Sequence, residues 1–466
     1  MDNKEKYGEV FTPLEIIDEM FSHSEIFIIE YLEKASHLKI INVLDVGTGD
    51  GKFIKSFIEK YPILSRKIIF YGLEKNENCK NIFHENIKSI KNYPDYNIKF
   101  VNADIKESVN VLTQIKFDFI MGNPPFNNNG LIKVPCNNKI IKKDEGKSIW
   151  HVCIAKSLNM LKDGGFLLFV SPCLWLKPDK SNTYENLVNE NELLLIKNYD
   201  SKESHKIFKY KAQTPVNYFL VRKKYENKPN QKINNITIYD INNNNFLFNL
   251  KYNFPIPTHN IHIVNICQQI MEKYNIGNLS RVILKSNPVD IKKYGITNNI
   301  SETNKYKNIK TCILNRKTNN YDVKYEYSTL PCPFYNSSKI FCAHKRLPIY
   351  CEDYEGKYGI SKRDTYVITE IMLNEIYAPK ITPYNSKIYL KLLYEYLNSD
   401  FVKSICMCTR YRMNFLEKYA YMYVPNILEY YMKIIEIDEF LSNPCYINSI
   451  QYLTLVNNFI NLCKSN

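Results

Sequence analysis

Short apolar runs alternate with amphipathic segments along the first half of the chain. Runs of four to eight apolar residues bounded by turn residues are typical of buried strands, whereas apolar residues three and four positions apart indicate helices. The pattern predicts strands over residues 41–47, 67–74, 97–104, 117–123, 164–172, 192–199 and 214–223. Amphipathic segments predict helices such as 52–60 and 149–161. This alternation favours an α/β fold, with a mostly parallel sheet covered by helices on both faces.

The regular alternation ends with the last two predicted strands. Only residues 200–213 separate them, so we expect an antiparallel pair at the edge of the sheet. After Lys224 the chain becomes rich in Asn and Lys and only weakly periodic. We therefore place a boundary here, with domains 1–225 and 226–466. The second half holds short mixed segments with many tyrosines and Pro-bounded turns, which predict a mixed α+β domain of undetermined topology.

The charge balance adds a partner class to this picture. Lys and Arg number 62 against 48 Asp and Glu, so the formal net charge is +14. Such an excess favours a polyanionic partner, and the 37 Tyr and 24 Phe residues suit base stacking. An AT-rich gene also accounts for the bias toward Asn, Lys, Ile and Tyr, and we give that cause the larger share. No apolar run approaches the roughly 20 residues of a membrane span, so we expect no membrane association.

Cysteine usage indicates a reducing compartment. The 13 cysteines form no Cys-x-x-Cys pair, and the N-terminus is charged and polar. We expect reduced thiols and a cytoplasmic protein, or one in the DNA-containing compartment of a host if the source is viral. Cys332, Cys342, His344 and Cys351 lie near one another in sequence. Their spacing is not that of a zinc finger, so we expect no metal.

Parallel sheets bind ligands at the carboxyl ends of their strands, and the first such end is rich in glycine. Residues 45–51 read Asp-Val-Gly-Thr-Gly-Asp-Gly, where the glycines Gly47 and Gly49 allow a sharp turn close to a ligand. Neither competing nucleotide motif fits. The dinucleotide fingerprint requires Gly where Lys52 stands, and the P-loop requires Ser or Thr where Phe53 stands. Asp45 suits the cationic end of a ligand rather than a phosphate.

Two acids end the next two predicted strands. Glu74 can accept from both hydroxyls of a ribose, and Asp104 can accept from the exocyclic amine of an adenine. An acid at a strand end is more often merely solvated. In this order, after a glycine turn, the two acids predict a binding site for S-adenosylmethionine.

The fourth predicted strand runs into Asn123-Pro124-Pro125-Phe126. Two consecutive prolines lack the N–H groups that a helix interior or a central strand requires. The chain must therefore leave the strand here, holding an amide, a rigid backbone and an aromatic ring together.

This series of motifs resembles the S-adenosylmethionine-dependent amino methyltransferases. The segment Tyr7–Pro13 (YGEVFTP) is similar to the extra cofactor motif of the DNA adenine-N6 methyltransferases of restriction–modification systems. Its place before the glycine turn, with the variable half last, resembles the gamma, or Taq-like, class. The resemblance is close over about residues 7–223 and looser beyond. It implies a Rossmann-like class I methyltransferase sheet followed by a target-recognition domain.

The resemblance also implies the site residues. The catalytic residues would be Asn123, Pro124 and Phe126. Asn123 and the Pro124 carbonyl would accept hydrogen bonds from the target amine, and Phe126 would stack on the flipped base. The cofactor S-adenosyl-L-methionine would be bound by Phe11, Thr12, Pro13, Asp45, Gly47, Gly49, Glu74, Asp104 and Asn123.

Contacts to DNA are expected at further positions. Phe208 stands where this class places a second aromatic ring, although a core role is an equal alternative. Basic candidates in the second half are Lys345 and Arg346, beside His344, together with Arg410 and Arg412, which flank Tyr411. The loop 127–146 carries several Lys and Asn residues and is a candidate to close over substrate.

Two alternatives from other classes remain open. One is an RNA or protein-glutamine amino methyltransferase, because Asn-Pro-Pro-aromatic motifs serve any planar amine or amide. The other is a catalytically idle DNA-binding subunit with the same fold. The resemblance implies double-stranded DNA as the partner, a separate cognate restriction endonuclease and a monomeric enzyme.

Overall fold

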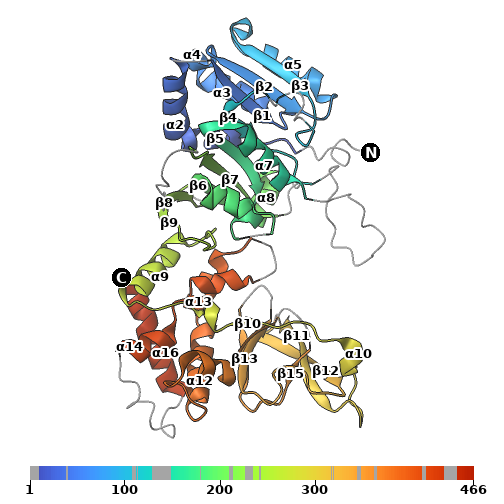
Figure 1. Cartoon of the computed structure of the whole chain (residues 1–466), viewed down its shortest axis with the longest axis vertical. Helices are drawn as coiled ribbons and strands as arrows, with labels where there is room; N and C mark the ends of the chain where they lie inside the picture. Colours follow the sequence, from blue (N-terminus) through green and yellow to red (C-terminus); the bar gives the residue numbers. More distant parts are fainter. Residues whose placement is uncertain are drawn as a thin grey trace. The chain divides into compact units, whose positions relative to one another are not determined.

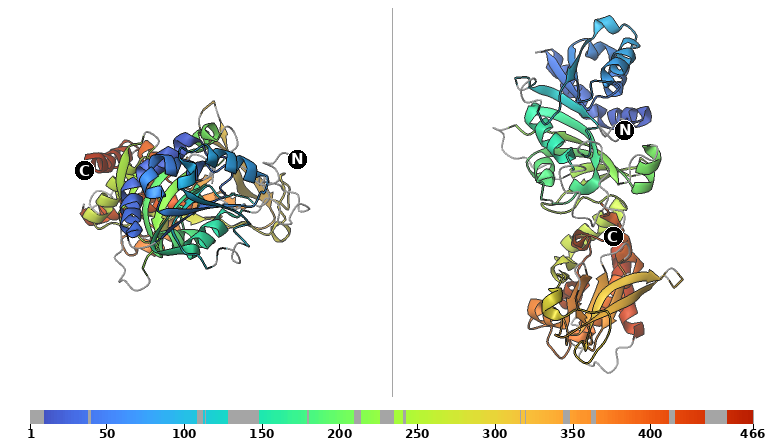
Figure 2. Two further views of the ribbon diagram at one scale, coloured as in Figure 1. Left: turned by 90° about the horizontal axis from the view of Figure 1, so that it is seen from above. Right: turned by 90° about the vertical axis from the view of Figure 1, so that its right-hand side faces the viewer.

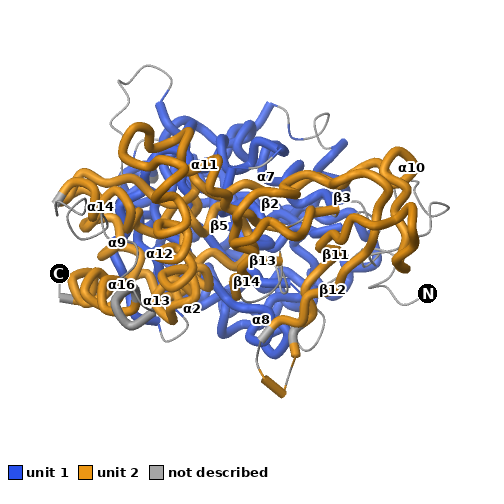
Figure 3. The backbone as a smooth tube through the Cα atoms, turned by 90° about the horizontal axis from the view of Figure 1, so that it is seen from below, with its two compact units in different colours: residues 1–254 blue, residues 255–466 orange. Residues whose placement is uncertain are grey.

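The structure is a computed structural model. The structure describes residues 10–37, 40–107, 112, 114–127, 148–178, 180–208, 214–225, 235–240, 243–315, 317–318, 320–343, 348–361, 365–411, 416–434 and 449–465. The chain divides into two compact units, Met1–Phe254 and Pro255–Asn466 (Figure 3). Each unit is described separately.

The first unit is built on one large sheet with helices beside it (Figures 1 and 2). Its strands are β1 (Ile41–Val46), β2 (Ile68–Glu74), β3 (Asn97–Asn102), β4 (Phe117–Gly122), β5 (Leu161–Pro172), β6 (Glu192–Tyr199), β7 (Val216–Arg222), β8 (Asn235–Tyr239) and β9 (Asn245–Asn249). Its α-helices are α2 (Leu14–Ser36), α3 (Lys52–Lys60), α4 (Pro62–Ser65), α5 (Cys79–Lys88), α7 (Trp150–Met160) and α8 (Ser201–Ile207).

Among the described residues, nine strands form this sheet in the order β3-β2-β1-β4-β5-β7-β6-β8-β9. Strands β1 to β5 are parallel, and β7 runs antiparallel between β5 and β6. The predicted Rossmann-like α/β fold with a mostly parallel sheet is therefore confirmed. The predicted antiparallel pair is present as β6 and β7, but its placement at the sheet edge was wrong. The hairpin β8–β9 extends the sheet, because β8 pairs with β6.

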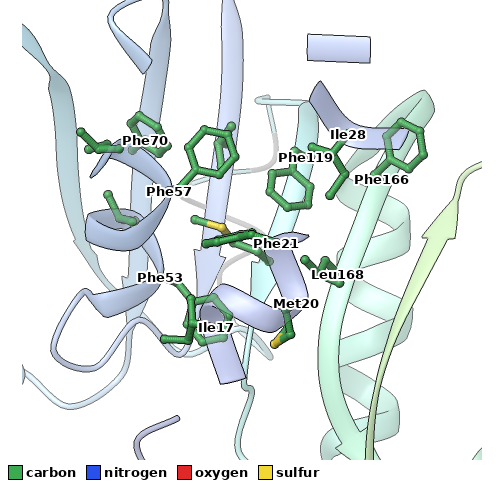
Figure 4. Packing of buried hydrophobic residues seen from close by; sticks show 14 of the residues in the cluster. Ile17, Met20, Phe21, Ile28, Phe53, Phe57, Phe70, Phe119, Phe166 and Leu168 are labelled. Atoms are coloured by element: carbon green, nitrogen blue, oxygen red, sulfur yellow. The ribbon is translucent and has the colours of Figure 1, made fainter. Parts of the chain in front are cut away.

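The hydrophobic core explains why the first half folds in this way. Alternate residues of a strand face opposite sides of the sheet, and both sides are buried here. Val43, Phe70 and Phe119 join the cluster formed with α2, α3 and α5, while Leu44 and Ile120 are buried on the opposite side. Figure 4 shows this cluster, in which the aromatic rings of α2 and α3 meet edge to face. Such two-sided burial requires continuous apolar runs, which is the pattern of the sequence.

The second unit contains two small sheets and a group of helices. Its strands are β10 (Leu284–Lys285), β11 (Tyr306–Asn315), β12 (Asn320–Ser328), β13 (Lys339–Ala343), β14 (Tyr350–Asp353), β15 (Gly359–Ile360) and β16 (Thr365–Thr369). Its α-helices are α9 (Ile261–Lys273), α10 (Ile291–Tyr294), α11 (Glu370–Tyr377), α12 (Ser386–Asn398), α13 (Asp400–Cys408), α14 (Ile427–Ile434) and α16 (Ser449–Ser465). The described strands form the sheets β10-β16-β13-β14 and β12-β11-β15, which share one hydrophobic cluster.

The boundary between the units lies later than the sequence suggests. We expected it at residues 225 and 226, but the first unit continues to Phe254. The difference is the hairpin β8–β9, whose strands have five residues each and lie in an Asn-rich stretch. None of the helices in the described ranges combines the length and apolar composition that a membrane span requires.

Candidate active site

Four neighbouring parallel strands end at the same edge of the large sheet. In the order β3-β2-β1-β4, Val46 pairs with Leu73 on one side and with Gly122 on the other. The strand ends are therefore in register, and the residues at or just after them gather along one edge. These are Asp45, Gly47 and Gly49 at β1, Glu74 at β2, Asp104 after β3, and Asn123, Pro124 and Phe126 after β4.

The turn after β1 packs against two other segments. Gly47 and Gly49 have φ angles of 70° and 50°, which side chains with a Cβ rarely adopt. A Cβ on Gly47 would lie 3.3 Å from the Asn123 carbonyl oxygen, and one on Gly49 would lie 2.8 Å from the Phe11 ring. Glycine is thus required both for the turn and for the close approach of these segments.

Asp45 lies beneath this turn and is fully buried. Its Oδ2 accepts a hydrogen bond from the Thr48 hydroxyl at 2.6 Å, while its Oδ1 has no partner among the described residues. Burial raises the pKa of Asp45 to about 8, although the Thr48 hydroxyl opposes the shift. A buried carboxylate oxygen without a donor is costly, so the site favours either a proton or a cationic group at Asp45.

Glu74 is held by two backbone N–H groups. Its Oε2 accepts from the Gly49 N–H at 3.1 Å, and its Oε1 accepts from the Asn76 N–H at 2.9 Å. Each carboxylate oxygen has two lone pairs, so the predicted bonds to ribose hydroxyls require no displacement of these contacts. The same bonds tie the glycine turn to the end of β2.

Asp104 is surrounded by cationic groups. Its Oδ1 accepts from the Lys106 N–H at 2.9 Å, and its Oδ2 lies 3.1 Å from the Lys75 Nζ. Burial raises the pKa of Asp104, but the bond from Lys106 and the ammonium of Lys75 outweigh this effect and hold the pKa below its ordinary value. The carboxylate is therefore charged and remains a hydrogen-bond acceptor.

The side-chain amide of Asn123 has a fixed orientation. Its Nδ2 donates to the Val10 carbonyl oxygen and to the Thr12 Oγ1, both at 3.1 Å. No donor within the described ranges reaches its Oδ1, so the oxygen is left as the accepting atom. Pro124 is buried, and Phe126 is half-buried against the core of the sheet.

The segment before α2 brings the predicted Phe11, Thr12 and Pro13 to this edge. Phe11 is 40% exposed, and the ammonium of Lys52 lies 5.6 Å from its ring centroid. Pro13 is the N-cap of α2, and its carbonyl oxygen accepts from the Ile16 and Ile17 N–H groups. The Thr12 side chain is buried, and its Oγ1 accepts from the Asn123 Nδ2.

Sequence reasoning missed three groups that complete the site. These are the Thr48 hydroxyl on Asp45, the Lys75 ammonium near Asp104 and the Val10 carbonyl on Asn123. Thr48 and Lys75 lie beside predicted residues in sequence, so their side-chain chemistry was a usable signal. A backbone carbonyl carries no signal of this kind.

The structure describes two of the predicted DNA-contact residues, Phe208 and Arg410. Phe208 is only 4% exposed and belongs to the core cluster of the first unit, so the structure favours the core alternative over an exposed stacking position. Arg410 is half-buried, and the adjacent Tyr411 is buried and donates to the Ile256 carbonyl oxygen. Lys345, Arg346, Arg412 and most of the loop 127–146 lie outside the described residues.

Most of the described cysteines are buried. Cys173, which follows β5, is 1% exposed, and burial raises the pKa of its thiol. Of the cysteines considered for zinc, Cys332 and Cys342 are also buried, and His344 lies outside the described ranges. Within those ranges no group of three or more His, Cys, Asp or Glu side chains is placed to hold a metal ion.

Known sequences match the part of the chain that carries this site. Residues 47–208 match the model of the family described as Eco57I restriction-modification methylase. Modification methylase CviBIII of Paramecium bursaria Chlorella virus NC1A is 28% identical over 180 residues, 37% of this chain and 39% of the relative. The type II restriction enzyme and methyltransferase RM.Eco57I of Escherichia coli is 24% identical over 285 residues, 47% of this chain and 28% of the relative. The matches thus span well under half the length of both relatives.

A solved structure is also similar in part. The methyltransferase subunit of a type I restriction-modification system from Streptococcus thermophilus has a TM-score of 0.37 and 16% identity. The similarity covers 59% of this chain and 54% of that chain.

Proposed function

We propose that this chain is a restriction–modification type DNA methyltransferase that transfers a methyl group from S-adenosylmethionine to the N6 amine of an adenine in duplex DNA. The observation that carries the proposal is the amide of Asn123, held at the end of β4 with its oxygen left to accept. The family match over residues 47–208 supports the class of reaction.

The chemistry of the target explains why such an amide is required. The amine of adenine is a poor nucleophile because its lone pair is delocalised into the ring. Hydrogen bonds from that amine to Asn123 Oδ1 and to the Pro124 carbonyl favour a pyramidal nitrogen. The donors of Asn123 are already engaged by Val10 and Thr12, so the amide does not have to reorient during the reaction.

The cofactor fits the residues at the neighbouring strand ends. S-adenosylmethionine supplies an electrophilic methyl group. Glu74 would accept from the ribose hydroxyls, and Asp104 would accept from the adenine amine of the cofactor. The glycine turn allows backbone to approach it closely. Asp45, with an unpaired Oδ1, would receive its cationic amino group.

The base must leave the duplex to reach this site, and Phe126 beside Asn123 would stack on it. The proposal is tested with the full chain, S-adenosylmethionine carrying an isotopically labelled methyl group, and mixed-sequence duplex DNA. We expect labelled N6-methyladenine in the digested nucleosides. RNA and a glutamine-containing peptide are the comparison substrates, and methylation of either one in place of DNA would refute the proposal.

Thr12 offers a test of positioning. In Thr12→Val the side-chain shape remains but the acceptor for the Asn123 amide is lost. A lost hydrogen-bond partner costs about 1–3 kcal/mol, and the amide is then held only by its bond to the Val10 carbonyl oxygen. We expect the single-turnover methylation rate to fall about tenfold, the equivalent of about 1.4 kcal/mol, with little change in cofactor affinity. Thr12→Ser keeps the hydroxyl and is the matched control. A loss of cofactor affinity at an unchanged rate would instead make Thr12 a cofactor ligand.

Asp45 predicts a pH dependence of cofactor binding. Because burial raises its pKa to about 8, a cationic ligand must displace a proton at lower pH. The affinity for S-adenosylhomocysteine, which has the same amino-acid end, should rise by up to about tenfold per pH unit from pH 6 to 8. Isothermal titration of the parent and of Asp45→Asn checks this, because the variant should bind weakly and independently of pH. Equal pH profiles would contradict a contact between Asp45 and the ligand.

A further inference from the structure

A lysine in the second unit lies over two tyrosine rings. The ammonium of Lys307 on β11 is 4.0 Å from the ring centroid of Tyr325 on β12. It is 5.2 Å from that of Tyr358, which directly precedes β15. The two rings are 4.9 Å apart. We call these three residues the Lys–Tyr face.

Strand pairing explains how these residues meet. In the sheet β12-β11-β15, Ile309 pairs with Tyr325 and Asn308 pairs with Gly359. Lys307 and Ile309 lie two positions apart and thus on one side of β11, and Tyr358 stands one residue before Gly359. On this side Ile309 belongs to a buried hydrophobic cluster. Lys307, Tyr325 and Tyr358 are only half-buried. The face is therefore the partly open end of a hydrophobic cluster.

Among the described residues, no acidic side chain pairs with Lys307. Nearby lysines have acidic neighbours, since Lys357 pairs with Glu355 and Lys310 lies 3.8 Å from Glu326. In the described part of the chain, no carboxylate lies within ion-pair distance of Lys307. A cation over aromatic rings gains stabilisation but keeps its charge and its N–H donors. These donors are available to an external anion.

We propose that the Lys–Tyr face binds the phosphate backbone of duplex DNA. The inference rests on the proposed function, which requires this chain to hold a duplex, and it names where the second unit does so. Phosphate contacts typically come from Lys, Arg and Tyr side chains, and the rings hold the ammonium in place before binding. The net charge of +14 is complementary to the duplex. Among the arginines predicted for this role, the described Arg410 adjoins a buried residue, Tyr411.

The test compares two lysines that each lie over a tyrosine ring. Lys307→Gln removes the charge on the Lys–Tyr face. Lys99→Gln is the matched control, because the exposed Lys99 also lies over a tyrosine ring, 5.3 Å from that of Tyr71, but in the first unit. Binding of the full chain to a fluorescent mixed-sequence duplex is measured from 50 to 300 mM salt. Thermal unfolding of each variant verifies that the fold is intact.

We expect Lys307→Gln to reduce the slope of log affinity against log salt by about 0.9, the value for one phosphate contact, and to weaken binding about eightfold at 0.1 M salt. Lys307→Arg keeps a charge that stacks on aromatic rings and should restore both values, and Lys99→Gln should leave both at the parental level. Equal effects of Lys307→Gln and Lys99→Gln would overturn the proposal. So would Lys307-dependent binding of single-stranded RNA in preference to the duplex.

The same samples distinguish a failure of the proposed methylation from a failure of the proposed DNA contact at the Lys–Tyr face. If the parent methylates adenine but Lys307→Gln binds duplex with parental salt dependence, only the Lys–Tyr face is refuted. If the parent binds duplex through Lys307 yet yields no N6-methyladenine, the proposed methylation fails and the binding face stands. A parent that does not bind duplex at all refutes both.

Discussion

Asn123→Ala is expected to lower the single-turnover methylation rate by about two orders of magnitude or more, the range for lost transition-state hydrogen bonds. The variant removes Oδ1, an acceptor that matters most as the target amine becomes pyramidal. An interaction that strengthens in the transition state affects the chemical rate rather than ground-state affinity. Rapid-quench measurements with cofactor and duplex DNA in excess report this rate directly.

Affinities provide the control for this prediction. Cofactor and DNA dissociation constants should change much less than the rate, because the Val10 and Thr12 acceptors contacted by Asn123 are on the protein itself. Phe126→Ala should behave differently, losing about 1–3 kcal/mol of stacking on the flipped base, which 2-aminopurine fluorescence reports. If Asn123→Ala methylates adenine at the parental rate, the hydrogen-bonding role of the amide is refuted.

Gly122→Ala is expected to be the most destabilising single change near the site. Gly122 has a φ of 139°, and a Cβ there would lie 2.4 Å from the Val46 carbonyl oxygen and 3.0 Å from the Val46 backbone nitrogen. Neither atom can move without separating β4 from β1. Backbone strain of about 1–3 kcal/mol adds to a similar cost of overpacking. Differential scanning calorimetry should show the first unit melting roughly 10 °C lower.

A second glycine provides the comparison. A Cβ on Gly277 would meet only the side-chain carboxylate of Glu429, at 3.1 Å, and a flexible side chain can yield. Gly277→Ala should therefore unfold close to the parental temperature. Gly122→Ala should also lose methylation, because Gly122 directly precedes Asn123. An alanine at 122 that leaves both the melting temperature and the rate unchanged would show that β1 and β4 can separate at little cost.

The first unit was largely predictable because its strands are buried on both sides. Such strands produce continuous apolar runs, and the predicted bounds 192–199 and 52–60 coincide with those of β6 and α3. The residues at strand ends follow from the same pattern, since parallel strands end at a common edge. The resemblance to restriction–modification methylases is confirmed by the family match over residues 47–208.

The features that were missed depend on contacts distant in sequence or on weak patterns. Asn123 is oriented by groups more than a hundred positions earlier, and no local pattern signals such a bond. The strands β8 and β9 have only five residues each, so the pattern that would identify them is short. Phe208 resembled a stacking residue by position alone, whereas its 4% exposure depends on how α8 packs.

The strands of the second unit and their pairing could not be predicted, because their sequence patterns are also weak. Its sheets are small, and β10 and β15 have only two residues each. Strands of this length carry almost no periodicity. The contact between Lys307 and Tyr358 requires β11 to pair in parallel with β15. These strands are separated in sequence by β12, β13 and β14, so no local pattern predicts that they pair.

The hairpin β8–β9 has a practical consequence for anyone who wishes to produce the two units separately. A fragment ending at residue 225 would lack β8, and residues 195–197 of β6 would lose their partner strand on that side and become the edge of the sheet. An exposed edge strand of this kind pairs with strands of other molecules, so such a fragment should aggregate. Ending the fragment at residue 254 retains the hairpin, so that β6 keeps its pairing with β8.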